Sequence, residues 1–478
     1  MTSQAHPRSP MTSTWENVFQ EQKQFTRHLR VESLAERKNR LEKLRKWIHD
    51  NRSRIHQAMY DDFRKAALEV DAIEIFHVLN EIKQALSHLE DWARPQKVDA
   101  PLTMLGTRSF IQYEPKGVCL IISPWNYPFC LAIGPLVSAI AAGNNVIIKP
   151  SELTPNVSAL IKSMASALFS EREVFVVEGD AEVSKRLLEL PFDHIFFTGS
   201  TAVGKEVMKA AAANLASVTL ELGGKSPCIV AEDANLKEAA ERIAVAKLVN
   251  NGQTCVAPDY IFVHKSRHDE FAKALQQAMI KRFSLDGNYE QSPSYCRVIN
   301  DRHFLRLERL VDDAVEQGAT IFLGGKNDAT QRFFHPVILS NVANQARILQ
   351  EEIFGPIVPL IPYTSTDEVV DFINARPKPL ALYLFSRSGK VQKRILAETS
   401  AGGVCINDCG IHFLNHELPF GGVNYSGMGK SHGKYGFVAF SNEKPVLQQR
   451  SGITSVKVFY PPYTQTSRRL INWFFKFF

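Results

Sequence analysis

The chain has 478 residues, of which 45% are hydrophobic and 22% are charged, a composition that excludes a disordered, collagenous or disulfide-scaffold protein. Lys and Arg outnumber Asp and Glu by 56 to 50, and a net charge of +6 on this length does not indicate a nucleic-acid partner. The seven cysteines are scattered without CxxC pairs, which argues against a disulfide framework or a zinc site and favours a reducing, cytoplasmic setting. At about 150 residues per domain, the length indicates two or three domains.

The N-terminal region begins with a polar stretch and continues as helices. Residues 1–14 lack the apolar core of a secretory signal and are expected to form a disordered tail. From about residue 33 to residue 91, apolar residues recur at spacings of three, four and seven, which predicts two amphipathic helices. Residues 95–116 are expected to form an arm. The alternating run that ends at residue 114 is compatible with a hairpin as well as with an arm.

After Lys116 short apolar runs alternate with helical stretches, which is typical of a parallel, doubly wound sheet with helices on both faces. The first series of predicted strands covers 118–122, 146–148, 174–177, 195–197 and 218–220. A second series of the same kind covers 228–231, 260–263, 320–323, 357–362, 380–385 and 403–406. We therefore predict an α/β protein with two doubly wound domains, 15–222 and 223–422, followed by a bridging segment, 423–460, and an aromatic tail, 461–478.

Three residues could carry covalent chemistry. Cys255 is a possible nucleophile, since Gly252, Gln253 and Thr254 beside it are small or polar, although a lone cysteine is more often a buried apolar residue. Glu221 follows a predicted strand and precedes two glycines, so it could act as a general base or simply cap a helix. Asn126 could stabilise an oxyanion, or it could be a turn residue in a Pro-rich loop.

Two further segments could bind a nucleotide. The loop from Gly199 to Gly204 joins a predicted strand to a helix, where free N–H groups could hold a pyrophosphate, but it lacks the full GxGxxG pattern. Lys149 and Glu152 follow another strand and could bind the two hydroxyls of an adenosine ribose, or could mark only the start of a helix. In open α/β sheets ligands bind at the carboxyl ends of the strands, where these segments are expected.

Several motifs together resemble the aldehyde dehydrogenase superfamily, over roughly residues 16–449. They occur in the order and spacing of that family, and the match is specific because it involves several separate segments. The motifs are ProTrpAsn at 124–126, LysProSerGlu at 149–152, PheThrGlySer at 197–200, GluLeuGlyGlyLys at 221–225, GlyGlnThrCys at 252–255, GluGluIlePheGlyPro at 351–356 and LeuProPheGlyGly at 418–422. The segments SerGlyMetGlyLysSerHisGly at 426–433 and PheSerAsnGluLysProVal at 440–446 resemble the class 3, or fatty-aldehyde, branch.

The resemblance implies NAD(P)-dependent oxidation of aldehydes to carboxylic acids, without a metal. Cys255 is expected to form a thiohemiacetal and then a thioester, with the oxyanion held by Asn126 and by the backbone N–H of Cys255. Glu221 is expected to activate the water that hydrolyses the thioester.

The cofactor residues implied by the resemblance come from both domains. NAD is the expected cofactor, because a carboxylate at Glu152 disfavours the extra phosphate of NADP. NADP nevertheless remains possible. The implied residues are Lys149 and Glu152 for the ribose, Gly199, Ser200 and Gly204 for the pyrophosphate, and Leu222, Glu352 and Phe354 for the nicotinamide end.

The substrate is expected to be a medium- or long-chain aliphatic aldehyde, or another apolar or aromatic one. Tyr127, His412 and Phe413 are expected to line its tunnel, although Tyr127 fits a packing role equally well. A homodimer is implied by the resemblance to class 3. Alternatives are a non-catalytic or lipid-binding protein on the same fold, and an aldehyde dehydrogenase that forms acyl-coenzyme A.

The C-terminal residues 468–478 combine Arg and Lys with Trp and Phe. No apolar stretch reaches the roughly 18 to 20 residues that a membrane-spanning helix needs, but this segment could lie in a membrane surface as an amphipathic anchor. It could also pack on a partner subunit or over the tunnel entrance.

Overall fold

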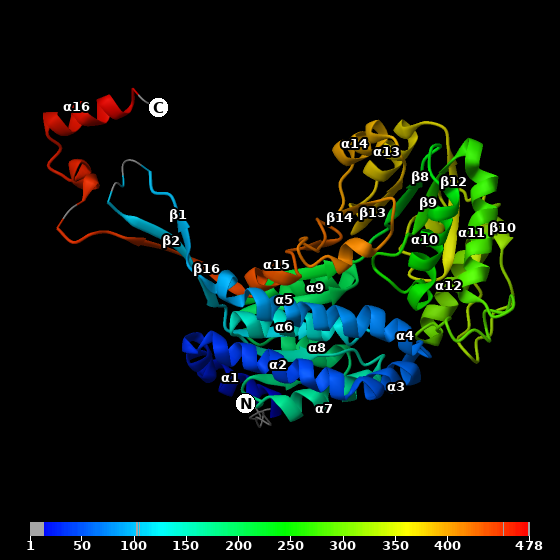
Figure 1. The fold of residues 1–478 in the computed structure, drawn as a ribbon, viewed down its shortest axis with the longest axis horizontal. Coiled ribbons are helices and arrows are strands. Elements are labelled where there is room, and N and C mark those ends of the chain that lie inside the picture. Colours follow the sequence, from blue (N-terminus) through cyan, green and yellow to red (C-terminus); the bar gives the residue numbers. More distant parts are fainter. Residues whose placement is uncertain (1–13, 102–103, 105, 453, 477–478) are drawn as a thin grey trace, which may run out of the picture.

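The computed structural model describes residues 14–101, 104, 106–452 and 454–476. The expected disordered tail therefore lies outside the described residues, except for Thr14, which begins the first helix. Figure 1 shows two lobes that each contain a sheet, and an arm that extends away from the lower lobe. Among the described residues, no helix is both long and apolar enough to cross a membrane.

The first lobe is built on a six-stranded sheet in the order β15-β7-β6-β3-β4-β5. Five strands are parallel, and the short β15 joins β7 in the antiparallel sense. Its strands are β3 (Val118–Ile122), β4 (Asn145–Lys149), β5 (Val174–Val176), β6 (His194–Gly199), β7 (Ser217–Leu222) and β15 (Gly427–Met428). β15 lies beyond residue 422, so the segment 423–460 contributes a strand to this sheet in addition to leading into the arm.

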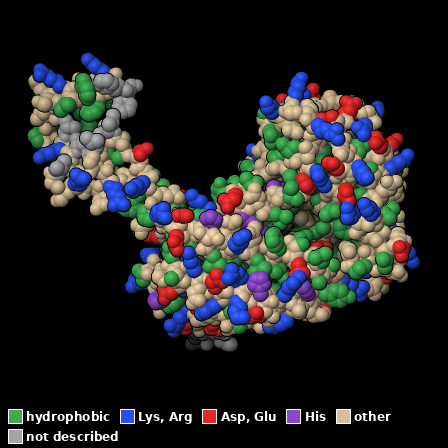
Figure 2. Space-filling model, viewed as in Figure 1, with side chains coloured by type: hydrophobic (Ala, Val, Ile, Leu, Met, Phe, Trp, Pro, Cys, Tyr) green, Lys and Arg blue, Asp and Glu red, His purple; other side chains and the backbone are tan. Residues whose placement is uncertain are grey.

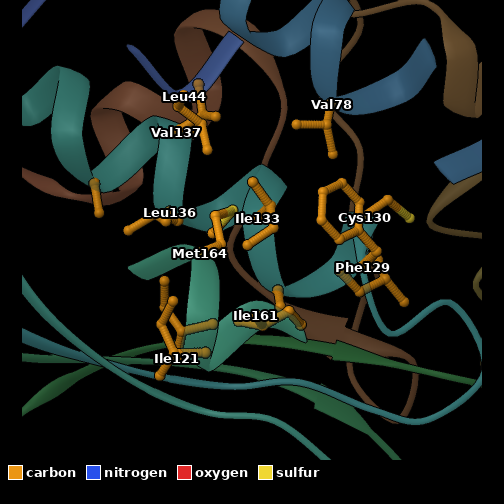
Figure 3. Packing of buried hydrophobic residues seen from close by; sticks show 14 of the residues in the cluster. Leu44, Val78, Ile121, Phe129, Cys130, Ile133, Leu136, Val137, Ile161 and Met164 are labelled. Atoms are coloured by element: carbon orange, nitrogen blue, oxygen red, sulfur yellow. The ribbon is translucent and has the colours of Figure 1, made fainter. Parts of the chain in front are cut away.

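Helices cover both faces of this sheet, because its buried strands alternate their side chains between two cores. Cys119 and Ile121 of β3 pack with α2, α3, α5, α6 and α7, whereas Val118 and Leu120 pack with α1, α8 and α9 (Figures 1 and 3). The helices are α1 (Thr14–Val31), α2 (Leu34–Asp50), α3 (Arg52–Phe63), α4 (Ala67–Glu69), α5 (Phe76–Ala93), α6 (Cys130–Ala142), α7 (Pro155–Leu168), α8 (Ala181–Leu188) and α9 (Thr201–Ala213).

The prediction of two helices over residues 33–91 is wrong in the number of helices. Three long helices, α2, α3 and α5, occupy this stretch, together with α4 and a π-helical turn, η1 (Val70–Ile75). Asn51 ends α2 and begins α3, and Arg64 ends α3 in the left-handed conformation, with φ 54°. Hydrophobic spacing runs through both breaks, so periodicity alone does not reveal them.

The second lobe is built on a seven-stranded sheet in the order β10-β11-β12-β9-β8-β13-β14. Its strands are β8 (Pro227–Val230), β9 (Tyr260–His264), β10 (Thr320–Leu323), β11 (Val337–Ser340), β12 (Ile357–Tyr363), β13 (Ala381–Phe385) and β14 (Gly403–Ile406). The segment 320–323, expected in a parallel series, is an antiparallel edge strand, and β11 beside it was not predicted. Its helices are α10 (Leu236–Leu248), α11 (His268–Phe283), α12 (Asp301–Glu316), α13 (Thr366–Asn374) and α14 (Gly389–Glu398).

The arm is a three-stranded antiparallel sheet of β1 (Gln96–Val98), β2 (Arg108–Pro115) and β16 (Ser441–Gln448). The helix α15 (Gly433–Ala439) leads into β16, and α16 (Gln465–Phe474) stands at the end of the arm, away from both lobes (Figure 1). Short helical turns complete the chain: η3 (Val249–Gly252), η4 (Lys265–Arg267), η5 (Arg347–Leu349), η6 (Ile411–Leu414) and η7 (Ser455–Phe459).

Candidate active site

Cys255 lies on a loop between α10 and β9 whose backbone is fixed by left-handed residues. Asn250, Asn251 and Gly252 have φ of 52°, 57° and 72° in succession. A Cβ at Gly252 would collide with the backbone carbonyl of Gly355, so only glycine allows the loop to approach so closely. This conformation turns the chain sharply before Cys255, whose side chain is half-buried.

Asn126 is buried beside this loop, tied to it by two hydrogen bonds and held by a third from Lys65. Its side-chain amide donates to the carbonyl oxygen of Gln253 at 3.1 Å. Its own backbone carbonyl accepts from the side chains of Asn250, at 2.8 Å, and Lys65, at 3.3 Å. An amide nitrogen carries two hydrogens, so one N–H of Asn126 is left for a substrate oxygen.

Glu221, at the end of β7, is buried and accepts a hydrogen bond from the Ser431 hydroxyl. Burial raises the pKa of its carboxyl group to about 7, and the Ser431 hydrogen bond and the positive charge of Lys430 limit the rise. A carboxyl group with such a pKa is half-ionised near neutral pH, as a general base requires. Both Glu221 and Cys255 face the same cleft.

The Cys255 thiol is held in its neutral form in this environment. Its pKa is raised to about 12, chiefly by burial and further by the carboxyl groups of Glu352 and Glu221. A thiol must lose its proton to attack a carbonyl carbon, so the site needs a base or a positive charge near this sulfur.

The cleft between the two lobes encloses about 1150 Å³, including space open to solvent. Most of the predicted catalytic and cofactor residues line it: Asn126, Gly199, Ser200, Glu221, Leu222, Cys255, Glu352 and Phe354. The lining also includes residues that were not predicted as site residues, among them Trp125, Thr198, His303 and Arg306.

These residues fit a dinucleotide. Ser200 caps the N-terminus of α9, whose free N–H groups suit a phosphate, and Gly199 leaves the backbone accessible beside it. The Thr198 hydroxyl is buried in the cleft wall without a hydrogen-bond partner in the described structure, so a donor or acceptor remains there for a ligand.

Glu352 and Phe354, the residues expected at the nicotinamide, belong to one segment of the cleft wall. Arg306 donates to the carbonyl oxygens of Glu352, at 3.1 Å, and Ile353, at 2.5 Å, which fixes this segment to α12. Phe354 has a left-handed φ of 47° and meets the edge of the Trp125 ring, with centroids 5.3 Å apart. Burial, together with the charge of Asp259, raises the pKa of Glu352 to about 8.

Three predicted cofactor residues lie outside the lining of this cleft. Lys149, at the end of β4, forms an ion pair of 2.8 Å with Glu152, whose side chain is 42% exposed. Gly204 packs against Leu222, because a Cβ there would collide with the leucine side chain. Gly204 thus brings α9 close to β7, whereas Gly199 and Ser200 face the cleft.

A second, apolar pocket meets the cleft at Cys255. It encloses about 880 Å³ and is lined by Tyr127 and Phe413, as predicted for the tunnel, whereas His412 is not among its lining residues. The Tyr127 hydroxyl and the Thr254 hydroxyl are hydrogen-bonded at 2.7 Å, which orients Tyr127 beside the cysteine loop. Sequence reasoning missed much of its apolar wall: Ile73, Leu131, Val245, Val249, Ile411 and Leu414.

Comparison with known proteins gives a consistent result. The model of the aldehyde dehydrogenase family matches residues 12–446. A 4,4'-diaponeurosporen-aldehyde dehydrogenase of Staphylococcus aureus is 46% identical, over 96% of this chain and 99% of its own. Aldehyde dehydrogenase family 3 member B3 of mouse is 40% identical, over 99% of this chain and 98% of its own.

Solved structures agree with the fold. The substrate-bound state of Staphylococcus aureus AldH superposes with a TM-score of 0.93 at 44% identity, covering 97% of this chain and 100% of that one. An NAD+ complex of an aldehyde dehydrogenase from Bacillus cereus has a TM-score of 0.82 at 27% identity, covering 90% and 88%. The predicted fold class and the resemblance to this family, with its class 3 branch, are confirmed.

Proposed function

Because the chain belongs to the aldehyde dehydrogenase family, we propose that it oxidises apolar aldehydes of medium or long chain, with Cys255 as nucleophile, Asn126 as oxyanion donor and Glu221 as base. The protein is an oxidoreductase that oxidises aldehydes with NAD or NADP. One observation carries the substrate class: Cys255 lines both the polar cleft and the apolar pocket. An aldehyde whose carbonyl group reaches the sulfur would therefore keep its chain among apolar side chains.

The first half of the reaction acylates the cysteine. The Cys255 thiol loses its proton to solvent water in the open cleft. The resulting thiolate forms a C–S bond with the aldehyde carbon, and the new oxyanion accepts hydrogen bonds from Asn126 Nδ2 and the backbone N–H of Cys255. The cofactor, when bound, supplies a positively charged hydride acceptor. As hydride leaves the substrate carbon, the C=O bond re-forms and a thioester remains on Cys255.

The second half releases the acid. Glu221 takes a proton from water as the water oxygen bonds to the thioester carbon. The tetrahedral intermediate collapses, the C–S bond breaks, and the Cys255 thiolate leaves with the electron pair. A base beside the thioester favours water over coenzyme A as the acceptor, so the product is the free carboxylic acid.

NAD is the proposed preferred cofactor. Glu152 carries a carboxylate beside Lys149 at the end of β4, where the adenosine ribose is expected. A 2'-phosphate on that ribose would be repelled by this charge.

A panel of aldehydes from two to eighteen carbons, assayed with NAD and with NADP, tests this function. We expect kcat/KM to rise with chain length in the wild type and Cys255→Ala to produce no NADH. Cys405→Ala removes another thiol, one that lies outside both cavities, and serves as the matched control. NADH production by Cys255→Ala at the wild-type rate would refute the mechanism.

The arm and tail suit association with partners. We infer a cytoplasmic homodimer that pairs through the arm, with α16 on a membrane surface. Trp473 and Phe475 are exposed beside Arg468, Arg469 and Lys476, and Figure 2 shows hydrophobic side chains next to basic ones on this segment. Deleting residues 468–478 should abolish sedimentation with anionic liposomes while retaining aldehyde oxidation. Unchanged sedimentation after the deletion would refute the proposed membrane contact of residues 468–478.

A further inference from the structure

A small cavity lies beside Glu221, between α5, α6 and the segment before α15. Its polar lining consists of His77, Glu81, Ser138, Glu221, Ser431 and His432, and we call it the histidine cavity. It encloses about 310 Å³, of which about 20 Å³ can be occupied by the centre of a water molecule. That space is enough for one or two ordered waters.

Glu221 is the residue shared by this cavity and the catalytic cleft. The Ser431 hydroxyl donates to Glu221 Oε1, and His432, next in the chain, lies in the cavity wall. His432 has a left-handed φ of 71°, which is unusual for a residue with a side chain. Such backbone strain is concentrated at functional sites.

Three imidazole rings meet beside this cavity. The ring of His77 lies 4.9 Å from that of His432 and 5.0 Å from that of His416, centroid to centroid. Glu81, one turn after His77 on α5, accepts from the backbone N–H of Gly433 at 3.1 Å. Its other oxygen lies 3.3 Å from His416 Nε2.

The cluster contains buried polar atoms that the described structure leaves without hydrogen-bond partners. They are His77 Nδ1 and His432 Nδ1, whereas Glu81 Oε1 and His416 Nε2 face each other. Buried polar atoms in native proteins are paired with protein groups or with ordered water, so two such atoms on one cavity wall point to a ligand that can both donate and accept. Water is the ligand with that chemistry and size.

We propose that the histidine cavity is a proton-exit path, in which Glu221 passes the proton of the hydrolytic water through Ser431 and cavity water to His432 and Glu81. The proposal rests on the hydrolytic role of Glu221 proposed above. The proton bound to Glu221 moves to the Ser431 oxygen as Ser431 gives its own proton to cavity water. That water in turn gives a proton to the cluster, and Glu221 returns to its carboxylate form. His77, His416, His432, Ser431 and Glu81 act as positioning residues because none of them touches the reacting carbon.

The protonation states of the cluster suit this transfer. Burial lowers the pKa of His77 to about 3 and lowers that of His432 well below its usual value, so both rings are neutral at pH 7. Burial raises the pKa of Glu81 to about 8. A neutral imidazole and a protonated carboxyl group each carry one donor and one acceptor, so each can accept a proton at one atom and release one at another.

The charged neighbours set the direction of this path. Lys430 favours the carboxylate of Glu221, whereas Glu221 itself opposes ionisation of Glu81. Farther along, the Asn80 amide lies 2.7 Å from His416 Nδ1, which leaves Nε2 to face Glu81. His416 is buried and the next residue, Glu417, is exposed, so this end of the cluster lies near the surface. His412, on the same segment, adds to the depression of the His432 pKa and keeps that ring neutral.

A divalent metal is the competing occupant. One ligand atom each from His77, Glu81 and His432 lie within 4.8 Å of one another. A structural zinc site takes four protein ligands, one more than this group supplies. The group therefore lacks one ligand of a structural zinc site, and metal analysis of the purified protein belongs in the test.

The test separates acylation from hydrolysis in Glu81→Gln and His432→Gln. We expect both variants to retain the rapid first burst of NADH and to lose about tenfold or more in steady-state kcat at pH 7. Imidazole or formate added as a small proton carrier should restore part of kcat in the variants. The solvent deuterium isotope effect on kcat should rise, because proton exit then limits turnover.

Asp62→Asn is the matched control, since Asp62 is also a buried carboxyl group with a raised pKa but lies far from the cavity lining, against α7. It should leave kcat unchanged. Wild-type kcat, isotope effect and pH profile in folded Glu81→Gln and His432→Gln would overturn the proposal. Stoichiometric zinc in the purified wild type, whose removal abolishes activity, would overturn it as well. Failure of the wild type itself to produce NADH would instead refute the proposed function.

Discussion

The side-chain amide of Asn126 donates to the backbone carbonyl of Gln253, two residues before Cys255, at 3.1 Å. This contact connects the first lobe to the cysteine loop of the second, so the oxyanion donor and the nucleophile are positioned by the same hydrogen bond. Gln253 is itself fixed, because its side chain bonds the backbone of Asn250, Arg297 and Ile299.

Asn126→Ala removes the oxyanion donor and the contact between the lobes. We expect kcat/KM to fall about 10²- to 10³-fold, because one oxyanion donor contributes that much in comparable sites. Steady-state NADH formation measures the loss, and Asn126→Asp, which keeps the size but not the N–H, should lose as much. Equal activity of Asn126→Asp and wild type would contradict the donor role.

Glu221→Gln removes the base while keeping the side-chain shape. We expect a normal first burst of NADH followed by a steady rate lower by about 10²- to 10⁴-fold. In the wild type, the hydrolytic rate should rise roughly tenfold between pH 6 and pH 8, because the carboxylate is the active form and its pKa is about 7. A flat hydrolytic rate over that range would show that another group is the base.

Lys65→Met tests the buried support of Asn126. Lys65 and Glu74 form an ion pair of 3.0 Å with both side chains fully buried, and Glu74 also accepts from the backbone N–H of Cys130. Removing one partner leaves the other charge uncompensated, so the free energy of unfolding should fall by about 3–5 kcal/mol. Urea unfolding measures this change, and the double variant Lys65→Met/Glu74→Gln should recover part of it. If the double variant recovers none of the free energy of unfolding, the loss in Lys65→Met comes from packing and not from the unpaired charge.

Val245→Trp narrows the mouth of the apolar pocket at a partly exposed position on α10. We expect kcat/KM for long-chain aldehydes to fall about tenfold while that for a two-carbon aldehyde is unchanged, since only a long chain reaches the mouth. Val245→Ala, which makes the side chain smaller instead of larger, is the control and should leave kcat/KM for long-chain aldehydes unchanged. A uniform loss across the panel would place the long chain elsewhere.

Glu152→Ser removes the carboxylate that opposes the 2'-phosphate of NADP. We expect the ratio of kcat/KM for NADP to that for NAD to rise about tenfold. Glu182→Ser, which removes an exposed carboxylate from α8, is the control. An unchanged ratio would show that the ribose does not lie beside Glu152.

The sequence allowed prediction of the parts of the molecule that are local in the chain. The strand-and-helix alternation predicted both parallel sheets, and the GlyGlnThrCys and GluLeuGlyGly segments indicated Cys255 and Glu221, which the structure brings to one cleft. The edge strand β10 was assigned the wrong sense, because an apolar run does not encode the direction of its neighbour.

The apolar pocket and the histidine cavity were missed for a different reason. Ile73, Val245 and Ile411 line one pocket from three distant elements, and each reads in sequence as an ordinary apolar residue. His77 and Glu81 show an i, i+4 spacing on α5 that could have signalled a shared face, but nothing in the sequence places His432 against them. Such sites are created by tertiary packing.

The central claim is that Cys255 carries a thioester that Glu221 hydrolyses. Intact-protein and peptide mass spectrometry of Glu221→Gln, mixed with a long-chain aldehyde and NAD, tests it most directly. We expect an adduct on the peptide of Cys255 with the mass of the aldehyde less the hydride and the thiol proton, and no adduct in Glu221→Gln/Cys255→Ala. The same adduct on another cysteine, or its persistence in the double variant, would contradict it.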